Sequence, residues 1–165
     1  MGQAGPRLTV LLYHDVGEPL PGAYPGLTVG TRRFEQHLRL LARLRRTPVH
    51  PRDLAGTLPP NPVLITFDDG YAGLTANALP LLRRYATPAL LFAVSGHIGG
   101  TNAWDAQEGW RTQPLMGAEA LSEWRTADMS VGSHTRTHPD LTKLAPDALE
   151  QELRGSREDL EGLLG

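Results

Sequence analysis

The sequence predicts an α/β protein with a parallel β-sheet. Three short apolar runs, at residues 8–13, 63–67 and 89–94, have the length and composition of strands buried in such a sheet. Stretches with helical periodicity separate them, and this alternation is typical of α/β folds. Side chains able to bind a metal follow a strand candidate at two points of the chain, and α/β folds place their chemistry at such strand ends.

The first elements follow from composition and periodicity. The run at residues 8–13 is almost continuously apolar, so we expect a strand buried on both faces. The Pro- and Gly-rich residues 17–30 indicate a loop. Thr31 is the expected N-cap of a helix that ends near Arg46. The apolar face of this helix comprises Phe34, Leu38, Leu41 and Leu44.

In the middle of the chain, the residue pattern predicts a short strand at residues 47–50, a loop over 51–62 and a buried strand at 63–67. A helix follows, and Pro80 is tolerated in it only near a first turn. We therefore expect this helix to start late or to be broken. Its inner face comprises Leu74, Ala78, Leu81 or Leu82, and Tyr85.

The last elements begin with a strand at residues 89–94 and a long loop over 95–114, and long ordered loops are usually functional. A short helix at 117–127 and a strand at 129–132 come next. Pro146 is a suitable first residue for a final helix. The inward residues of the two helices are Leu121 and Trp124, then Leu149, Leu153, Leu160 and Leu164.

Bulk properties limit the classes of function. With 165 residues the chain is long enough for one domain with a hydrophobic core. A formal net charge of −2 offers no electrostatic reason to expect nucleic acid or an anionic membrane as a partner. No cysteine is present, so His, Asp or Glu must hold any metal. The run at residues 8–13 is too short for a signal sequence or a membrane span, and we expect a cytoplasmic protein.

Two motifs suggest one divalent-metal site. Asp68 and Asp69 follow one predicted strand, and His134 and His138 follow another. A single helical turn would place the two imidazoles on the same side. Both histidines and one aspartate would supply the three ligands of a catalytic metal, and the other aspartate would act as general base on bound water. Capping of the following helix is the structural alternative for the acids, but it does not account for both carboxylates.

These motifs resemble those of a known family. Residues 66–71 and 132–141 are similar to the first two motifs of the polysaccharide deacetylases, the carbohydrate esterases of family 4 with a NodB homology domain. Residues 13–16 are similar to the family's opening. The resemblance implies a hydrolase that removes acetyl groups from N-acetylated sugars, less often O-acetylated ones, of a poly- or oligosaccharide. It also implies a divalent metal cofactor, zinc first, with cobalt, nickel or manganese as alternatives.

The resemblance also assigns roles within the site. Asp68 would be the catalytic base, while Asp69, His134 and His138 would be the metal ligands. Four further residues are candidates for contact with an acetylated carbohydrate. They are His14 and His97 near strand ends, Tyr71 beside the acid pair, and Trp104 in the long loop. Packing at a helix start is the alternative for Tyr71, and closure of the barrel rim is the alternative for Trp104.

The family's later motifs, one of which supplies the general acid, do not occur in this sequence. We therefore expect residues 1–165 to form the N-terminal portion of a NodB-like domain, a partial (β/α) barrel of parallel strands with outer helices that does not close. A complete barrel of this kind needs on the order of 200 or more residues. An open sheet has an unpaired edge through which copies of the chain could associate.

Two alternative functions remain open at this point. One is a non-catalytic remnant that binds a metal or a glycan without turnover. The other is a deacylase that acts on a non-sugar amide with the same half-site. A general acid is typically worth ~10²–10⁴-fold in rate, so we expect metal binding but poor turnover from the chain without that motif.

Overall fold

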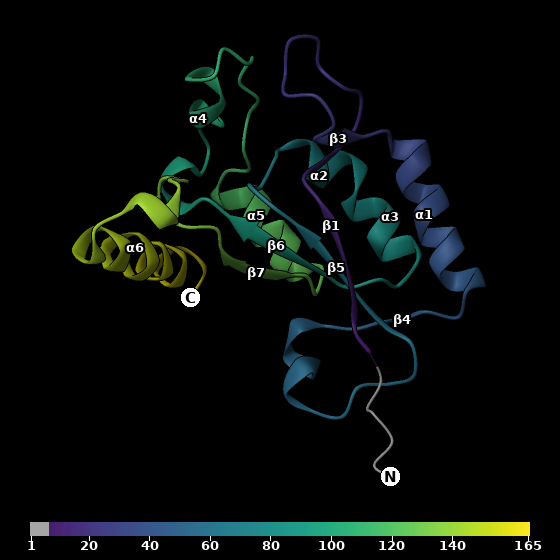
Figure 1. Ribbon diagram of the computed structural model, residues 1–165. Coiled ribbons are helices and arrows are strands. Elements are labelled where there is room, and N and C mark those ends of the chain that lie inside the picture. The colour runs from purple at the N-terminus through teal and green to yellow at the C-terminus, as the bar shows by residue number, and fades with distance from the viewer. Residues whose placement is uncertain (1–6) are drawn as a thin grey trace.

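The computed structural model describes residues 7–165, arranged as a parallel sheet with helices packed around it (Figure 1). Residues 1–6 lie outside the described residues. They belong to the expected domain, and the expectation about a signal sequence partly depends on them. The strands are β1 (Thr9–Tyr13), β2 (Asp15–Val16), β3 (Thr28–Val29), β4 (Thr47–Pro48), β5 (Pro62–Phe67), β6 (Ala89–Ala93) and β7 (Ser130–Ser133). The α-helices are α1 (Thr31–Arg43), α2 (Gly73–Asn77), α3 (Leu79–Arg84), α4 (Ala103–Ala106), α5 (Ala118–Thr126) and α6 (Pro146–Leu164). Short 3₁₀ helices lie at Pro51–Ala55, Ser95–His97 and Leu141–Lys143.

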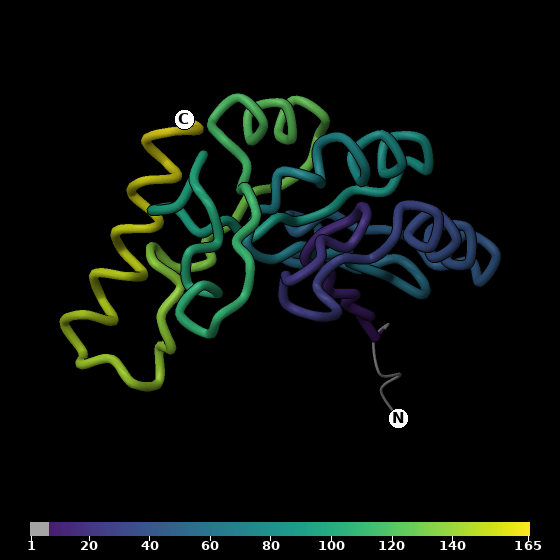
Figure 2. Tube along the Cα trace, turned by 90° about the horizontal axis from the view of Figure 1, so that it is seen from above, coloured from purple at the N-terminus to yellow at the C-terminus, as the bar shows by residue number. Residues whose placement is uncertain are grey.

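The main sheet has the strand order β1-β5-β6-β7, with β4 paired to the beginning of β5. Every pairing in it is parallel, which confirms the predicted α/β class. Figure 2 shows the helices following one another in an arc around the sheet, and the sheet does not close on itself. Because parallel strands share a direction, the carboxyl ends of β1, β5, β6 and β7 lie along one edge. This edge carries all four residues of the two predicted motifs.

Burial along the strands shows which face of the sheet is covered. In β6 the buried residues Ala89, Leu91 and Ala93 alternate with half-buried ones. The same alternation occurs in β1, where Val10 and Leu12 are 52% and 57% exposed. The prediction that β1 is buried on both faces is therefore wrong. The strand lies at the edge of an open sheet, so only one of its faces is covered by helices.

Several helix boundaries differ from the predicted ones. Gly30, not Thr31, occupies the N-cap of α1, and that helix ends at Arg43 because Arg45 adopts a left-handed backbone with φ of 52°. The helix after β5 is broken, as Pro80 predicted, into α2 and a separate α3 with the proline in its first turn. In α6 the predicted apolar residue Leu153 is 49% exposed.

The core lies between the sheet and the helical arc and is rich in aromatic side chains. The rings of Phe67 and Trp124 meet edge to face with centroids 5.7 Å apart, and Phe34 approaches Phe67 at 5.8 Å. Trp124 is fully buried and donates a hydrogen bond from Nε1 to the carbonyl of Ser130 at 3.2 Å. Helix α5 is thereby joined to both β5 and β7. Among the described helices, none combines the length and apolar character needed to cross a bilayer.

Replacing Trp124 by alanine is expected to cost about 3–5 kcal/mol of the free energy of unfolding, since it leaves a large cavity beside Phe67. Urea denaturation followed by circular dichroism measures this loss. Trp110→Ala serves as the control, because Trp110 is only half-buried and packs against the exposed Tyr24. Equal losses in the two variants would contradict the assignment of Trp124 to the core.

Candidate metal centre

The acid pair lies in a tight turn directly after β5. Asp69 and Gly70 both have positive φ, 70° and 87°, a conformation that glycine adopts freely and aspartate tolerates. The amide of Asp68 donates to the carbonyl of Tyr13 at 2.9 Å, which ties the turn to the end of β1. Neither carboxylate caps α2, whose N-cap is Ala72 without a side-chain bond. The capping alternative for the two acids is therefore wrong.

The histidine pair lies in a loop after β7. The amide of His134 donates to the carbonyl of Ala93 at 2.9 Å, so the loop continues the pairing of β7 with β6. Thr135 and His138 have left-handed φ values of 67° and 61°, and the prediction of one helical turn between the histidines is wrong. This backbone costs roughly 1–2 kcal/mol per non-glycine residue. The amide of His138 donates to Thr135 Oγ1 at 3.0 Å, which helps to hold the loop closed.

The loop and the turn bring three ligand atoms together. His134 Nε2 and His138 Nε2 lie 3.3 Å and 3.5 Å from Asp69 Oδ1. One ligand atom from each of the three residues lies within 4.8 Å of the others. Two ligands held about 2.1 Å from one tetrahedral zinc ion lie about 3.4 Å apart. The spacing therefore fits a single cation of that size.

The environment of Asp69 supports the same interpretation. Its carboxylate is 5% exposed, and Oδ1 has no hydrogen-bond partner among the described residues. A buried carboxylate oxygen without a partner is costly unless a cation or a donor meets it. The two imidazoles reach this atom from one side at ion-pair distance. The donor set of one carboxylate and two imidazoles is suited to zinc and similar divalent ions.

Charges and burial shift the pKa values around the centre. Contact with the Asp69 carboxylate raises the pKa of His134, whereas burial lowers the pKa of His138. Burial also raises the pKa of Asp68, and the charges of His134 and His14 oppose that rise. A second carboxylate therefore lies beside the triad in a partly desolvated environment. His14 at the end of β1 is near enough to act on it electrostatically.

The segment between β6 and α5 contains a 3₁₀ helix and α4 where an uninterrupted loop was predicted, and it forms an aromatic wall next to the histidines. The indole of Trp104 stacks on the His138 ring with centroids 4.3 Å apart, and His97 meets the indole edge to face at 5.3 Å. His97, Trp104 and His138 line one open groove of about 960 Å³, together with Tyr24 from the loop between β2 and β3. The structure thus places two of the four expected substrate contacts beside the predicted metal ligands.

Tyr71 does not share this groove. Its ring is 1% exposed, and its hydroxyl accepts a hydrogen bond from Asn102 Nδ2 at 3.1 Å. Burial raises the pKa of the phenol. The packing alternative describes Tyr71 better than the expected substrate contact, because a buried ring offers no face to a sugar.

Sequence reasoning missed Asn102, which is fully buried behind Trp104. Its Nδ2 also donates to Asp105 at 2.6 Å, and its Oδ1 accepts from the amide of Gln113 at 2.5 Å. The side chain thereby joins the two ends of the loop that carries Trp104. No periodicity or motif marks this asparagine, since its role depends on contacts between loop segments.

A glycine lets the 3₁₀ turn after β6 approach the histidine loop. The amide of Gly96 donates to the carbonyl of Arg136 at 2.8 Å, and a Cβ at this position would lie only 2.6 Å from the same oxygen. Gly96→Ala is therefore expected to displace the loop and to lower zinc affinity on the order of 10–100-fold, as other disturbances behind a metal ligand do. Isothermal titration of Zn²⁺ into metal-free protein measures the change.

Gly162→Ala is the matched control for this substitution. Gly162 lies in α6 with open space at its Cβ position. The control is expected to raise helix stability by up to ~1 kcal/mol and to leave zinc affinity unchanged. Unchanged affinity in Gly96→Ala as well would show that the loop does not depend on this close approach.

Fold and site together define an α/β protein with an open parallel sheet and a candidate metal centre at the carboxyl ends of its strands. A family model described as polysaccharide deacetylase matches residues 55–165. The chain belongs to the polysaccharide deacetylase family, which confirms the resemblance seen in the sequence.

Individual relatives agree with this assignment. The chain is 26% identical to YxkH of Bacillus subtilis (strain 168) over 157 residues, which is 92% of this chain and 50% of YxkH. It is 30% identical to a chitooligosaccharide deacetylase of Rhizobium leguminosarum bv. trifolii over 109 residues, 66% of this chain and 43% of that protein. Among solved structures, IcaB from Ammonifex degensii is similar with a TM-score of 0.75 at 25% identity, covering 96% of this chain and 70% of IcaB. The chain thus spans about half the length of the curated relatives it matches.

Proposed function

We propose that this protein is a metal-dependent hydrolase that removes acetyl groups from the N-acetylated sugars of a poly- or oligosaccharide. Asp69, His134 and His138 are the proposed metal ligands, and Asp68 is the proposed catalytic base. The observation that carries the proposal is the convergence of both imidazoles on the unpartnered Oδ1 of Asp69, with the Asp68 carboxylate beside them. Residues 1–165 are proposed to be the N-terminal portion of a NodB-like domain.

The proposed cofactor is a divalent ion, zinc first, with cobalt, nickel or manganese as alternatives. When bound, such an ion polarises an acetyl carbonyl and lowers the pKa of water. Asp68 then accepts the proton of the attacking water at a carboxylate oxygen, in the partly buried environment beside the three ligand residues. The water oxygen adds to the acetyl carbon, and the amide C–N bond breaks as the leaving nitrogen takes a proton from solvent, because no general acid is assigned among the described residues. Asp68 then releases its proton to solvent, and the products are acetate and the amine.

The groove beside the centre supports a sugar as substrate. Trp104 and Tyr24 are aromatic side chains on its lining, and His97 lies next to Trp104. Aromatic side chains combine an apolar face with a polar edge, which suits a sugar ring. His14 is proposed to orient the substrate from the end of β1, where its charge already acts on Asp68. The chitooligosaccharide deacetylase relative is named for substrates of this chemical class.

Acetate release from chito-oligosaccharides by the metal-loaded protein tests the proposal. The same protein is assayed without metal, and simple acetamides serve as the comparison substrate. Release from the oligosaccharide that depends on metal supports the proposal. Metal binding without release would instead indicate the non-catalytic alternative, and faster release from acetamides would indicate the non-sugar deacylase. No contact in the structure favours either alternative.

We also propose that two copies of the chain associate through the free edge of β1. Among the described strands β1 pairs only with β5, and Val10 and Leu12 are more than half exposed beside that edge. Unpaired edges with apolar side chains favour pairing between chains. Light scattering on the purified protein is expected to show a dimer that Leu12→Lys weakens, and a concentration-independent monomer would contradict this proposal.

A further inference from the structure

The final helix α6 contacts the histidine loop through one carboxylate. Glu152 Oε2 accepts hydrogen bonds from the amides of Arg136 and Thr137, both at 2.8 Å. Its other oxygen, Oε1, accepts from Thr137 Oγ1 at 2.7 Å. Hydrogen bonds to a charged carboxylate are stronger than neutral ones. A single side chain therefore holds two of the peptide groups between the two predicted ligands.

The carbonyls of the same loop are held by the 3₁₀ turn after β6. The amide of Ser95 donates to the carbonyl of Thr135 at 3.2 Å, and that of Gly96 donates to the carbonyl of Arg136 at 2.8 Å. Donors and acceptors of the loop backbone are thus paired with two different elements, the amides of Arg136 and Thr137 with α6 and the carbonyls of Thr135 and Arg136 with the 3₁₀ turn. The loop has little freedom to rotate while both sets of bonds are made.

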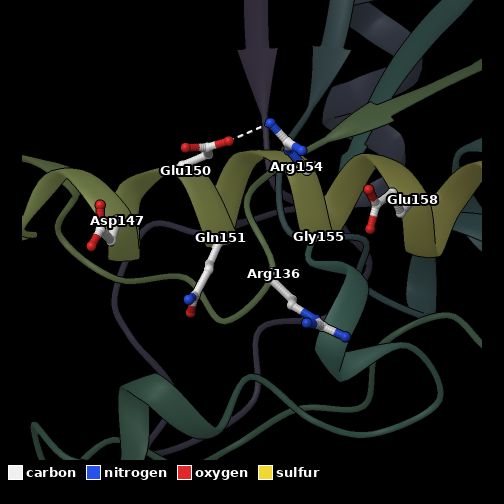
Figure 3. Close-up of a pocket in the computed structure, with 7 residues that line it drawn as sticks. All are labelled: Arg136, Asp147, Glu150, Gln151, Arg154, Gly155 and Glu158. Carbon is white, nitrogen blue, oxygen red and sulfur yellow. Dashed lines mark hydrogen bonds and ion pairs between the residues drawn. The ribbon is translucent and has the colours of Figure 1, made fainter.

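The Arg136 side chain adds a third contact with α6. Its Nε lies 3.0 Å from Asp159 Oδ2, and the same oxygen accepts from Ser95 Oγ at 2.8 Å. Figure 3 shows Arg136 alongside α6 near Gly155, in the pocket that Glu150 also lines. A Cβ at Gly155 would lie 3.2 Å from Arg136 Cδ and Nη1, so the arginine packs closely against the helix.

From this arrangement we propose that Glu152 is a positioning residue of the metal centre. It holds the loop in the left-handed conformation of Thr135 and His138 that directs both imidazoles to Asp69. Glu152 touches neither the metal nor the substrate and acts through the loop backbone. The inference rests on the proposed function, since it concerns the affinity of the same three ligands for a divalent ion.

Zinc titration of metal-free protein by calorimetry tests this role in three variants. Glu152→Ala removes all three hydrogen bonds and is expected to lower zinc affinity on the order of 10–100-fold, as is typical of groups that orient metal ligands. Glu152→Gln keeps an acceptor oxygen for the two amides and is expected to recover most of that affinity. Glu150→Ala is the matched control, because Glu150 lies about 200° around the helix from Glu152. Glu150 is exposed and pairs only with Arg154 among the contacts described.

Thermal unfolding of the metal-free variants separates positioning from general stabilisation. A positioning role predicts lower zinc affinity in Glu152→Ala at temperatures where the protein is still folded. Equal affinities in wild type and Glu152→Ala would overturn the inference and leave the proposed function intact. If Glu152→Gln lost as much zinc affinity as Glu152→Ala, the hydrogen bonds from Glu152 to the two amides would not explain the effect. A wild-type protein that binds no zinc would overturn the proposed function itself.

Discussion

Replacing Asp69 by asparagine is expected to lower zinc affinity by more than the roughly 100-fold lost when a group behind a metal ligand is removed. Asp69 Oδ1 is the atom that both imidazoles approach, at 3.3 Å and 3.5 Å, so its charge is central to the site. Asparagine keeps the size of the side chain and tolerates the left-handed backbone at this position. The fold is therefore expected to survive while the metal is lost. Calorimetric titration with Zn²⁺ measures the affinity.

Asp53→Asn is the control for this variant, because Asp53 is an exposed carboxylate near the opposite ends of the strands, in the 3₁₀ helix after β4. It is expected to bind zinc as the wild type does. Circular dichroism confirms that each variant is folded before titration. If Asp69→Asn binds zinc as tightly as wild type, the ion is held elsewhere and the proposed ligand set is wrong.

The neighbouring substitution Asp68→Asn is expected to lower turnover and to leave zinc binding largely intact. Turnover falls by about 10²–10⁴-fold, the usual contribution of a general base. Zinc affinity changes far less than in Asp69→Asn, since Asp68 is not among the three converging ligand residues. The amide cannot accept the proton of the attacking water, although its size and position match those of the carboxylate. Acetate release at saturating zinc measures turnover, and calorimetry measures binding.

The pair of variants makes this test specific, because the same chemical change is made at adjacent positions. Loss of turnover with metal retained in Asp68→Asn, and loss of metal in Asp69→Asn, would support the two assigned roles. Full turnover by Asp68→Asn would exclude it as the base. Loss of zinc in both variants to the same extent would instead assign both carboxylates to the metal.

Much of this architecture could be predicted from local patterns. Apolar runs marked β1, β5 and β6, and Pro80 marked the break between α2 and α3. The two motifs could be paired before the structure because parallel strands bring their carboxyl ends to one edge. Residue type was sufficient to identify the candidate metal ligands, since few side chains in a chain without cysteine can bind a divalent ion.

The exposure of β1 and the backbone of the histidine loop could not be predicted, because both depend on which other segments pack against them. The apolar sequence of β1 gives no sign that Val10 and Leu12 face an open side of the sheet. The spacing of His134 and His138 fits a helical turn, but contacts with β6 and α6 hold the loop in a different backbone. Exposure and loop geometry are set by neighbours that are distant along the chain.

The α/β class, the order of the main elements and the chemistry of the acid and imidazole pairs all follow from the residues alone. Periodicity and side-chain type are local properties, so they can be read from a single segment. The three-dimensional arrangement was needed to show that both imidazoles meet one oxygen of Asp69, that Tyr71 is buried, and that Glu152 bonds to the loop. Those facts arise from packing between segments, where burial and hydrogen bonding are shared among distant residues.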